Sequence, residues 1–416
     1  MKRLFKVTVM TGALTLLRMM FGFAISKVVA IYAGPTGLAM LGQLQNMVTS
    51  LNGIIASPTG SGVVKYTAEH HSKGYLFVSS WWRASIYWMI ILSGIIIPLG
   101  IIFSNYISVL LFDKNDWAWV ITVSMILLPI SALGTLCNSI LNGCQAYKRF
   151  IITGGIATII SGSIMLVLII MGNLRGALLA VALQSSLIGF ASILCNYRQP
   201  WLRFEYFFGK IETSHKRDMA AYILMAFVSA VTMPVSLIIV RNMLVSHVGW
   251  TEAGHWQAVW KISEVYISVI TMALGTYYLP RLASLKTVND ILNEIHNTAK
   301  IVLPLIIVMA IGIYILRDIA LMLLFTKQFY SARDLFSIQL IGDVVKIAGW
   351  LYAYPMLARR ATKWFITTEI LFSLFFVGAS FIFIRMFGVH GANLGYLLAY
   401  LLYFIVVFTN VKRFAQ

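Results

Sequence analysis

Charged side chains inside long apolar segments are the residues of this chain best placed to do chemistry. A charge at the centre of a bilayer costs about 2.5–3.5 kcal/mol on insertion scales, so each embedded charge needs a physical reason. Arg18, Lys27, Arg241 and Lys261 are embedded cations. Facing one water-filled cavity, they would bind a diphosphate or an acidic sugar as substrate. Lys27 and Arg241 lie toward the ends of their segments, so snorkelling to the membrane surface is the alternative.

Two carboxylates are embedded in the second half of the chain, and each has a lysine three residues away. Glu264 follows Lys261, and Lys346 follows Asp343, so each pair shares one face of a helix. One interpretation is that each pair only neutralises its own charge. In the other, Glu264, Asp343 and Lys346 form an ion-coupling or gating site, with H+ or Na+ as the coupling ion. We expect no other cofactor and no metal site.

Amide side chains recur along the faces of several predicted helices. Gln43 and Asn46 lie in one segment, Asn142 in another and Gln257 in a third. Amides that line a cavity suit the hydroxyl groups of sugars. The alternative is that they hydrogen-bond neighbouring helices, as polar residues in membrane bundles often do.

The sequence lacks the residue patterns that are typical of enzymes. None of its seven histidines stands in an HExxH pattern, and there is no glycine-rich phosphate loop. We therefore predict a transport protein without catalytic residues. The net charge of +18 is spread over the breaks between apolar segments, so we expect no nucleic acid partner.

The composition predicts a polytopic membrane protein. Hydrophobic residues make up 60% of the chain and charged residues only 11%, less than half the charged fraction of a typical soluble domain. Many apolar segments reach the roughly 20 residues that a membrane helix needs. We predict twelve helices over residues 5–32, 36–66, 76–104, 117–141, 149–172, 174–197, 217–245, 252–283, 296–317, 330–358, 361–386 and 389–411.

The positions of the cations predict the topology. With the N-terminus inside, Lys and Arg gather at every second break between the predicted helices, which satisfies the positive-inside rule and places both termini in the cytoplasm. These cations are Lys2, Arg3, Lys6, Lys65, Lys73, Arg83, Lys148, Arg149, Arg198, Arg203, Lys210, Lys216, Arg217, Arg281, Lys286, Lys300, Arg359, Arg360, Lys363, Lys412 and Arg413.

The chain also repeats itself. Lys148-Arg149-Phe150 aligns with Lys363-Trp364-Phe365, and Gly176-Ala177 aligns with Gly391-Ala392, both 215 positions apart. Six helices per copy give both copies the same orientation, so the repeat is parallel. We predict an all-α fold of two six-helix lobes, residues 1–197 and 217–416. A cytoplasmic linker, residues 198–216, joins them.

Several motifs carry a resemblance to a known family. They are Lys27, Gly34-Pro35, Gly37-Leu38, Gly254, Trp256-Gln257, Glu264, Tyr278-Leu279-Pro280, Arg317-Asp318, Arg333-Asp334-Leu335-Phe336, Gln339-Leu340, Gly342-Asp343-Val344 and Lys346. With them the chain resembles, over nearly its whole length, the Wzx-type flippases of O-antigen and enterobacterial common antigen (lipid III) synthesis. These belong to the multidrug/oligosaccharidyl-lipid/polysaccharide (MOP) exporter superfamily, whose fold is MATE-like.

The resemblance implies a function within lipopolysaccharide or common-antigen biosynthesis. The expected substrate is an undecaprenyl-diphosphate-linked oligosaccharide, either an O-antigen unit or lipid III. Ion-coupled alternating access would move it from the cytoplasmic to the periplasmic leaflet of the bacterial inner membrane. Membrane lipids, and the polymerase and chain-length regulator of the same pathway, are the implied partners. The alternative is a multidrug or other small-solute antiporter of the same superfamily, which should hold an embedded carboxylate in the first lobe; none is found there.

Overall fold

The computed structural model describes residues 2–285, 287–359 and 361–415, without the side chains of residues 2–9, 221, 222 and 276. This part of the chain is almost entirely helical and contains no strand. The predicted all-α fold is confirmed. Lys286, Arg360 and the side chains of Lys2, Arg3 and Lys6, which contribute to the predicted topology, lie outside the described residues.

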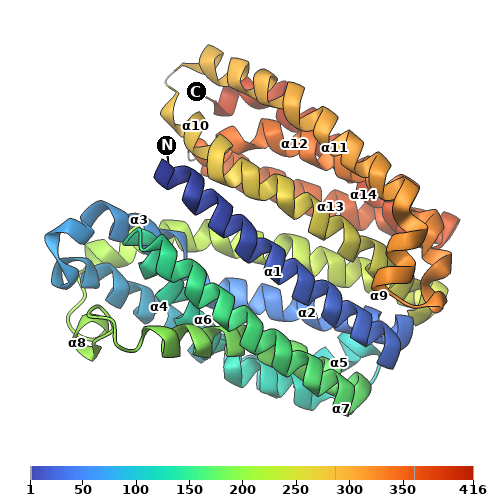
Figure 1. Cartoon of the computed structure of the whole chain (residues 1–416), viewed down its shortest axis with the longest axis horizontal. Coiled ribbons are helices and arrows are strands. Elements are labelled where there is room, and N and C mark those ends of the chain that lie inside the picture. The colour runs from blue at the N-terminus through green and yellow to red at the C-terminus, as the bar shows by residue number, and fades with distance from the viewer. Residues whose placement is uncertain (1, 286, 360, 416) are drawn as a thin grey trace. The chain divides into compact units, whose positions relative to one another are not determined.

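The helices follow one another with short connections (Figure 1). The first half contains α1 (Lys2–Tyr32), α2 (Gly34–Ala56), η1 (Ser57–Thr59), α3 (Ser61–His70), η2 (His71–Lys73), α4 (Tyr75–Ile102), α5 (Ser104–Phe112), η3 (Asn115–Trp117), α6 (Ala118–Gly143), α7 (Tyr147–Asn196) and α8 (Phe204–Phe207). The second half contains α9 (Thr213–Ala273), η4 (Leu274–Tyr278), α10 (Leu279–Ser284), α11 (Val288–Leu324), η5 (Lys327–Leu335), α12 (Phe336–Ala358), α13 (Thr362–Phe387) and α14 (Val389–Phe414).

The two longest helices are each interrupted by one non-helical residue. Asn173 breaks α7 with φ 48° and ψ −128°, and Gly249 breaks α9 with φ 86° and ψ 171°. Positive φ is open to glycine and strained for most other residues. Both residues fall in the predicted gaps between helices, so each long helix is a pair of antiparallel segments.

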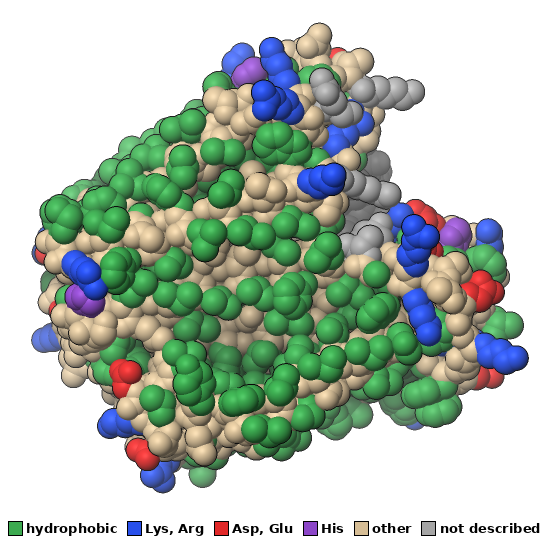
Figure 2. Space-filling model, turned by 180° about the vertical axis from the view of Figure 1, so that it is seen from behind, with side chains coloured by type: hydrophobic (Ala, Val, Ile, Leu, Met, Phe, Trp, Pro, Cys, Tyr) green, Lys and Arg blue, Asp and Glu red, His purple; other side chains and the backbone are tan. Residues whose placement is uncertain are grey.

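Nine helices in the described part of the chain are long and apolar enough to span a membrane, and α7 and α9 count once each. The helix α2 is not among them, because Gln43, Gln45, Asn46 and Asn52 lower its mean hydropathy. Hydrophobic side chains cover the middle of the face in Figure 2, with Lys, Arg, Asp and Glu at its margins. The protein is a multi-pass membrane protein, and the predicted number of twelve helices stays a prediction.

The predicted helix 36–66 is wrong in one respect. The helix α2 ends at Ala56, a short 3-10 turn with Pro58 follows, and α3 begins at Ser61. Proline cannot donate the backbone hydrogen bond that would continue α2. The sequence analysis also missed the short helices α5 and α8.

The chain forms two compact units. The first comprises the residues up to Tyr32 together with Met40–Val235, and the second comprises Ala33–Ala39 and the residues from Ser236 onward. The two units are defined by which residues contact one another. They do not test the predicted division into residues 1–197, 198–216 and 217–416, which stays a prediction. Within the first unit α6 lies beside α7, where Gly134 packs directly on the backbone of Gly189. Small residues at such crossings let membrane helices approach closely.

The repeat is visible in the backbone of each unit. Asn173 between the two segments of α7 and Gly388 between α13 and α14 share one conformation, φ 48°, ψ −128° and φ 58°, ψ −134°. Just beyond, Gly176 packs on the carbonyl of Leu168, and Gly391 packs on that of Phe383. Each of these features recurs 215 positions later, which supports the predicted repeat.

Candidate functional site

The buried ionic residues of the second unit form one continuous cluster. It is built from the part of α9 that starts at Ser236, from α12 and from α14. The break at Gly249 reverses the direction of α9, so residues before and after it face each other. Residues 343 and 346, one turn apart on α12, and the tyrosines of α14 complete the cluster.

Arg241 has no exposed surface. Its Nη2 donates a hydrogen bond to Oε1 of Gln257, and its guanidinium lies 5.5 Å from the ring centroid of Trp256. Gln257 is itself buried. A neutral amide and an aromatic face stabilise the guanidinium, and the carboxylate of Glu264 also acts on it electrostatically. Arg241 is therefore a buried cation with several partners among apolar helices.

A row of aromatic rings leads from Arg241 to α12 and α14. Trp256 lies 5.4 Å from Trp260, and Trp260 lies 5.1 Å from Tyr396 in an edge-to-face arrangement. Such geometry places the positive edge of one ring against the negative face of the next. The three rings are buried, so charged groups at the two ends of the row interact through a medium of low polarity.

Lys346 lies at the far end of the row inside a cage of aromatic rings. Its ammonium is 4.8 Å from the ring centroid of Trp350 and between 5.3 and 5.8 Å from those of Tyr400, Tyr396 and Trp260. The residue is only 8% exposed. No carboxylate of the described residues lies within 4.0 Å of its ammonium, so aromatic faces provide the direct contacts of this cation.

Asp343 is fully buried and surrounded by neutral donors. Oδ2 accepts a hydrogen bond from the hydroxyl of Tyr266 at 2.7 Å. Oδ1 accepts from the hydroxyl of Tyr396 at 2.8 Å and from Nε2 of Gln339 at 3.2 Å. Three charge-assisted hydrogen bonds replace much of the water that this carboxylate would have outside the protein.

The two predicted acid–lysine pairs therefore differ. Lys261 and Glu264 form an ion pair at 3.5 Å, and Glu264 also accepts a hydrogen bond from Nε1 of Trp260 at 3.0 Å. Asp343 and Lys346 form no ion pair within 4.0 Å, although their charges still interact at longer range. Whether they only neutralise each other or form a coupling site stays open.

The predicted residues of the first unit have different environments. Arg18 is exposed on α1, and its Nη2 reaches the backbone of α7 at Gly154. Lys27 and Asn46 are half-buried, Gln43 is fully buried and Asn142 is exposed. That these side chains share a cavity with Arg241 stays a prediction.

Sequence reasoning missed most of the neutral partners in the cluster. Tyr266, Trp350, Tyr396 and Tyr400 contact Asp343 or Lys346, but none was singled out. Gln339, which also contacts Asp343, was noted only as part of a motif of the family resemblance. The sequence did contain a signal for these partners. Gln339 lies four residues before Asp343, and Tyr396 lies four residues before Tyr400. Such pairs lie on one face of a helix.

The chain has the fold of solved membrane proteins of the MOP superfamily. A multidrug resistance MATE family transporter of that superfamily, in an inward-facing conformation, superposes with a TM-score of 0.76 at 14% identity over 98% of each chain. The lipid II flippase MurJ, in an inward closed conformation, also superposes with a TM-score of 0.76 at 14% identity, over 98% of this chain and 87% of MurJ.

In sequence, the chain is similar to the lipid III flippase of Escherichia coli (strain K12). The two are 28% identical over 407 residues, which cover 96% of each chain. No protein-family model matches the chain. The predicted resemblance and the predicted MATE-like fold are thereby confirmed.

Proposed function

We propose that this protein is a flippase for a lipid-linked oligosaccharide, and that it is a transporter rather than an enzyme. The observation that carries the proposal is the similarity to a lipid III flippase over 96% of both chains. The fold alone does not decide, because multidrug transporters share it. The substrate is an undecaprenyl-diphosphate-linked unit, either an O-antigen repeat or lipid III. It moves from the cytoplasmic to the periplasmic leaflet of a bacterial inner membrane.

The same proposal assigns roles to the buried charges. Arg241, with Arg18, Lys27 and Lys261, attracts the diphosphate or acidic sugars of the substrate, and Gln43, Asn46, Asn142 and Gln257 bind its hydroxyl groups. Arg241 has no exposed surface in this conformation, so it reaches substrate only when the second unit opens. The burial of this cation supports the role, since charge-assisted contacts with an anion are strong where water is excluded.

We also propose that transport is coupled to an ion. Asp343 and Lys346 are an acid and a base one turn apart, and Glu264 lies on the neighbouring helix segment. Binding of H+ or Na+ at Asp343 would change the hydrogen bonds from Tyr266 and Tyr396, which tie α12 to α9 and α14. Such contacts can bias an alternating-access equilibrium, because they differ between its states.

The topology and the protein partners belong to the proposal as well. The distribution of Lys and Arg supports cytoplasmic termini. A polymerase and a chain-length regulator of the same pathway would receive the flipped product.

A reconstituted assay tests the proposal. The protein is placed in vesicles with a fluorescent undecaprenyl-diphosphate oligosaccharide, and an impermeant quencher reports the fraction in each leaflet. We expect exchange between leaflets with wild-type protein, and none with protein-free vesicles or with a MATE multidrug transporter. Absence of exchange, together with drug efflux by the same preparation, would favour the antiporter alternative.

A further inference from the structure

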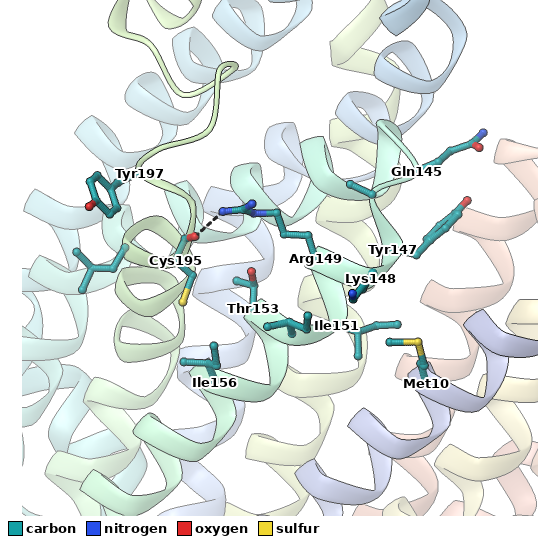
Figure 3. A pocket seen from close by; sticks show the side chains of 13 residues that line it. Met10, Gln145, Tyr147, Lys148, Arg149, Ile151, Thr153, Ile156, Cys195 and Tyr197 are labelled. Atoms are coloured by element: carbon teal, nitrogen blue, oxygen red, sulfur yellow. Dashed lines mark hydrogen bonds between the residues drawn. The ribbon is translucent and has the colours of Figure 1, made fainter. Parts of the chain in front are cut away.

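A pocket of about 910 Å³ lies in the first unit (Figure 3). It is bounded by the first turns of α7, by the C-terminal end of the same helix and by Met10 of α1. The break at Asn173 brings the two ends of α7 together.

The walls of the pocket are apolar. Ile152, Ile156 and Leu194 are 47%, 40% and 51% exposed, and they lie on helix segments long enough to span a membrane. Exposed isoleucine and leucine on such a segment face acyl chains rather than water. The pocket is therefore open to the hydrocarbon of the bilayer.

The mouth of the pocket is positively charged. Arg149 donates from Nη2 to the carbonyl of Cys195 at 3.0 Å, as drawn in Figure 3. It also donates from Nε to Oδ1 of Asn196 at 2.9 Å. Both acceptors are neutral, so the charge of Arg149 is not compensated. Lys148 is exposed and forms no ion pair in the described part of the chain. None of the lining residues is acidic.

An apolar slot with a cationic mouth at the membrane surface matches one class of ligand. We propose that this pocket binds an anionic phospholipid, with its phosphate at Lys148 and Arg149 and an acyl chain along Ile152, Ile156 and Leu194. Basic pockets between membrane helices attract anionic headgroups, and each Lys or Arg near the surface contributes about 1 kcal/mol. A free phosphate ion would gain no binding free energy from the apolar walls. A zwitterionic lipid would gain little binding free energy from the positively charged mouth.

Lipid binding to the full-length protein in detergent tests the inference directly. Phosphatidylglycerol, phosphatidylcholine and inorganic phosphate are titrated separately, with native mass spectrometry and the melting temperature as readouts. We expect phosphatidylglycerol to bind and stabilise, while the other two do neither. Lys148→Gln should weaken phosphatidylglycerol binding about fivefold, because one surface cation is lost. Ile156→Trp, which narrows the part of the slot that takes the acyl chain, should also weaken binding.

A matched control is Lys114→Gln, which removes an exposed lysine that does not line the pocket. Its phosphatidylglycerol affinity should equal that of wild type, and all variants should melt alike without lipid. Equal binding of phosphatidylcholine, stabilisation by inorganic phosphate, or unchanged affinity in Lys148→Gln would each overturn the inference. Displacement by undecaprenyl phosphate at lower concentration than phosphatidylglycerol would make the pocket a substrate site instead. None of these readouts depends on flipping.

Discussion

Tyr396 joins Asp343 to Lys346. Its hydroxyl donates to Oδ1 of Asp343 at 2.8 Å, while its ring centroid lies 5.7 Å from the ammonium of Lys346. One side chain on α14 thus contacts both charged groups of α12. A change in the charge of Asp343 would act on Lys346 through this ring as well as through space.

Mutation can separate the contribution of the Tyr396 hydroxyl from that of its ring. Tyr396→Phe removes one of the three hydrogen bonds to Asp343 and keeps the aromatic cage. We expect a loss of about 1–3 kcal/mol of stability, the usual cost when a buried charged acceptor loses a donor. Tyr400→Phe is the matched control, since Tyr400 lines the cage without bonding Asp343, and it should change little. Equal melting temperatures for both variants would contradict the assigned hydrogen bond.

Stability and transport should both respond at Lys346. Lys346→Met removes the cation beside the fully buried carboxylate of Asp343 and leaves that charge uncompensated, which is destabilising. We therefore expect a lower melting temperature, together with at least a tenfold loss of flipping in the vesicle assay. Lys346→Arg keeps the charge and should retain more activity than Lys346→Met. Full flipping by Lys346→Met would remove this residue from the proposed coupling site.

Arg241 and Gln257 should be energetically coupled. Removing either partner leaves the other buried without its hydrogen bond, so single substitutions to Ala cost more than the bond itself. A double-mutant cycle measured by denaturant unfolding should give a coupling of about 1–3 kcal/mol. Additive effects of Arg241→Ala and Gln257→Ala would show that the two side chains do not interact.

Gly176 and Gly391 occupy equivalent positions in the repeat and each packs closely on a backbone carbonyl. We expect substitutions of the two glycines to change stability in the same direction. Gly176→Ala and Gly391→Ala each place a methyl group against a backbone carbonyl, and overpacking of this kind costs about 1–3 kcal/mol. Gly155→Ala is the control, because an added methyl there meets open space, and helix propensity alone favours it by up to about 1 kcal/mol. The melting temperatures of Gly176→Ala and Gly391→Ala should fall, whereas that of Gly155→Ala should stay the same or rise.

Cys144, in the connection between α6 and α7, should react slowly with thiol reagents. Burial raises the pKa of its thiol to about 11, so little thiolate is present at neutral pH. In a Cys137→Ala, Cys195→Ala background, alkylation should accelerate up to about pH 11. Between pH 9 and 11 the folded protein binds more protons at this thiol than the unfolded chain does, so its stability falls as pH rises. A rate that levels off near pH 9 would contradict the raised pKa.

Much of the helix pattern follows from the sequence. The predicted break between residues 172 and 174 falls on Asn173, and Gly249 lies in the predicted gap between 245 and 252. Hydrophobic periodicity and turn-forming residues suffice for such local features. Pro58 could also have marked the end of α2.

The partners of the buried charges could not be predicted in the same way. The spacing of Asp343 and Lys346 suits an ion pair on an isolated helix, but the ammonium of Lys346 contacts aromatic rings of α9 and α14 instead. Which side chain fills the space beside a buried charge depends on tertiary packing, and Tyr396 looks in sequence like any interfacial or core tyrosine.

The turn that Asn173 shares with Gly388 bears on the ancestry of the gene. Two unrelated halves would have had to arrive separately at one rare backbone conformation, followed at equal spacing by glycines pressed on equivalent carbonyls. Duplication and fusion of a half-length gene explains all of this in one event. The ancestor would have been a self-associating protein with two identical subunits, and the buried acid and base of α12 would have arisen after fusion, once the copies were free to diverge.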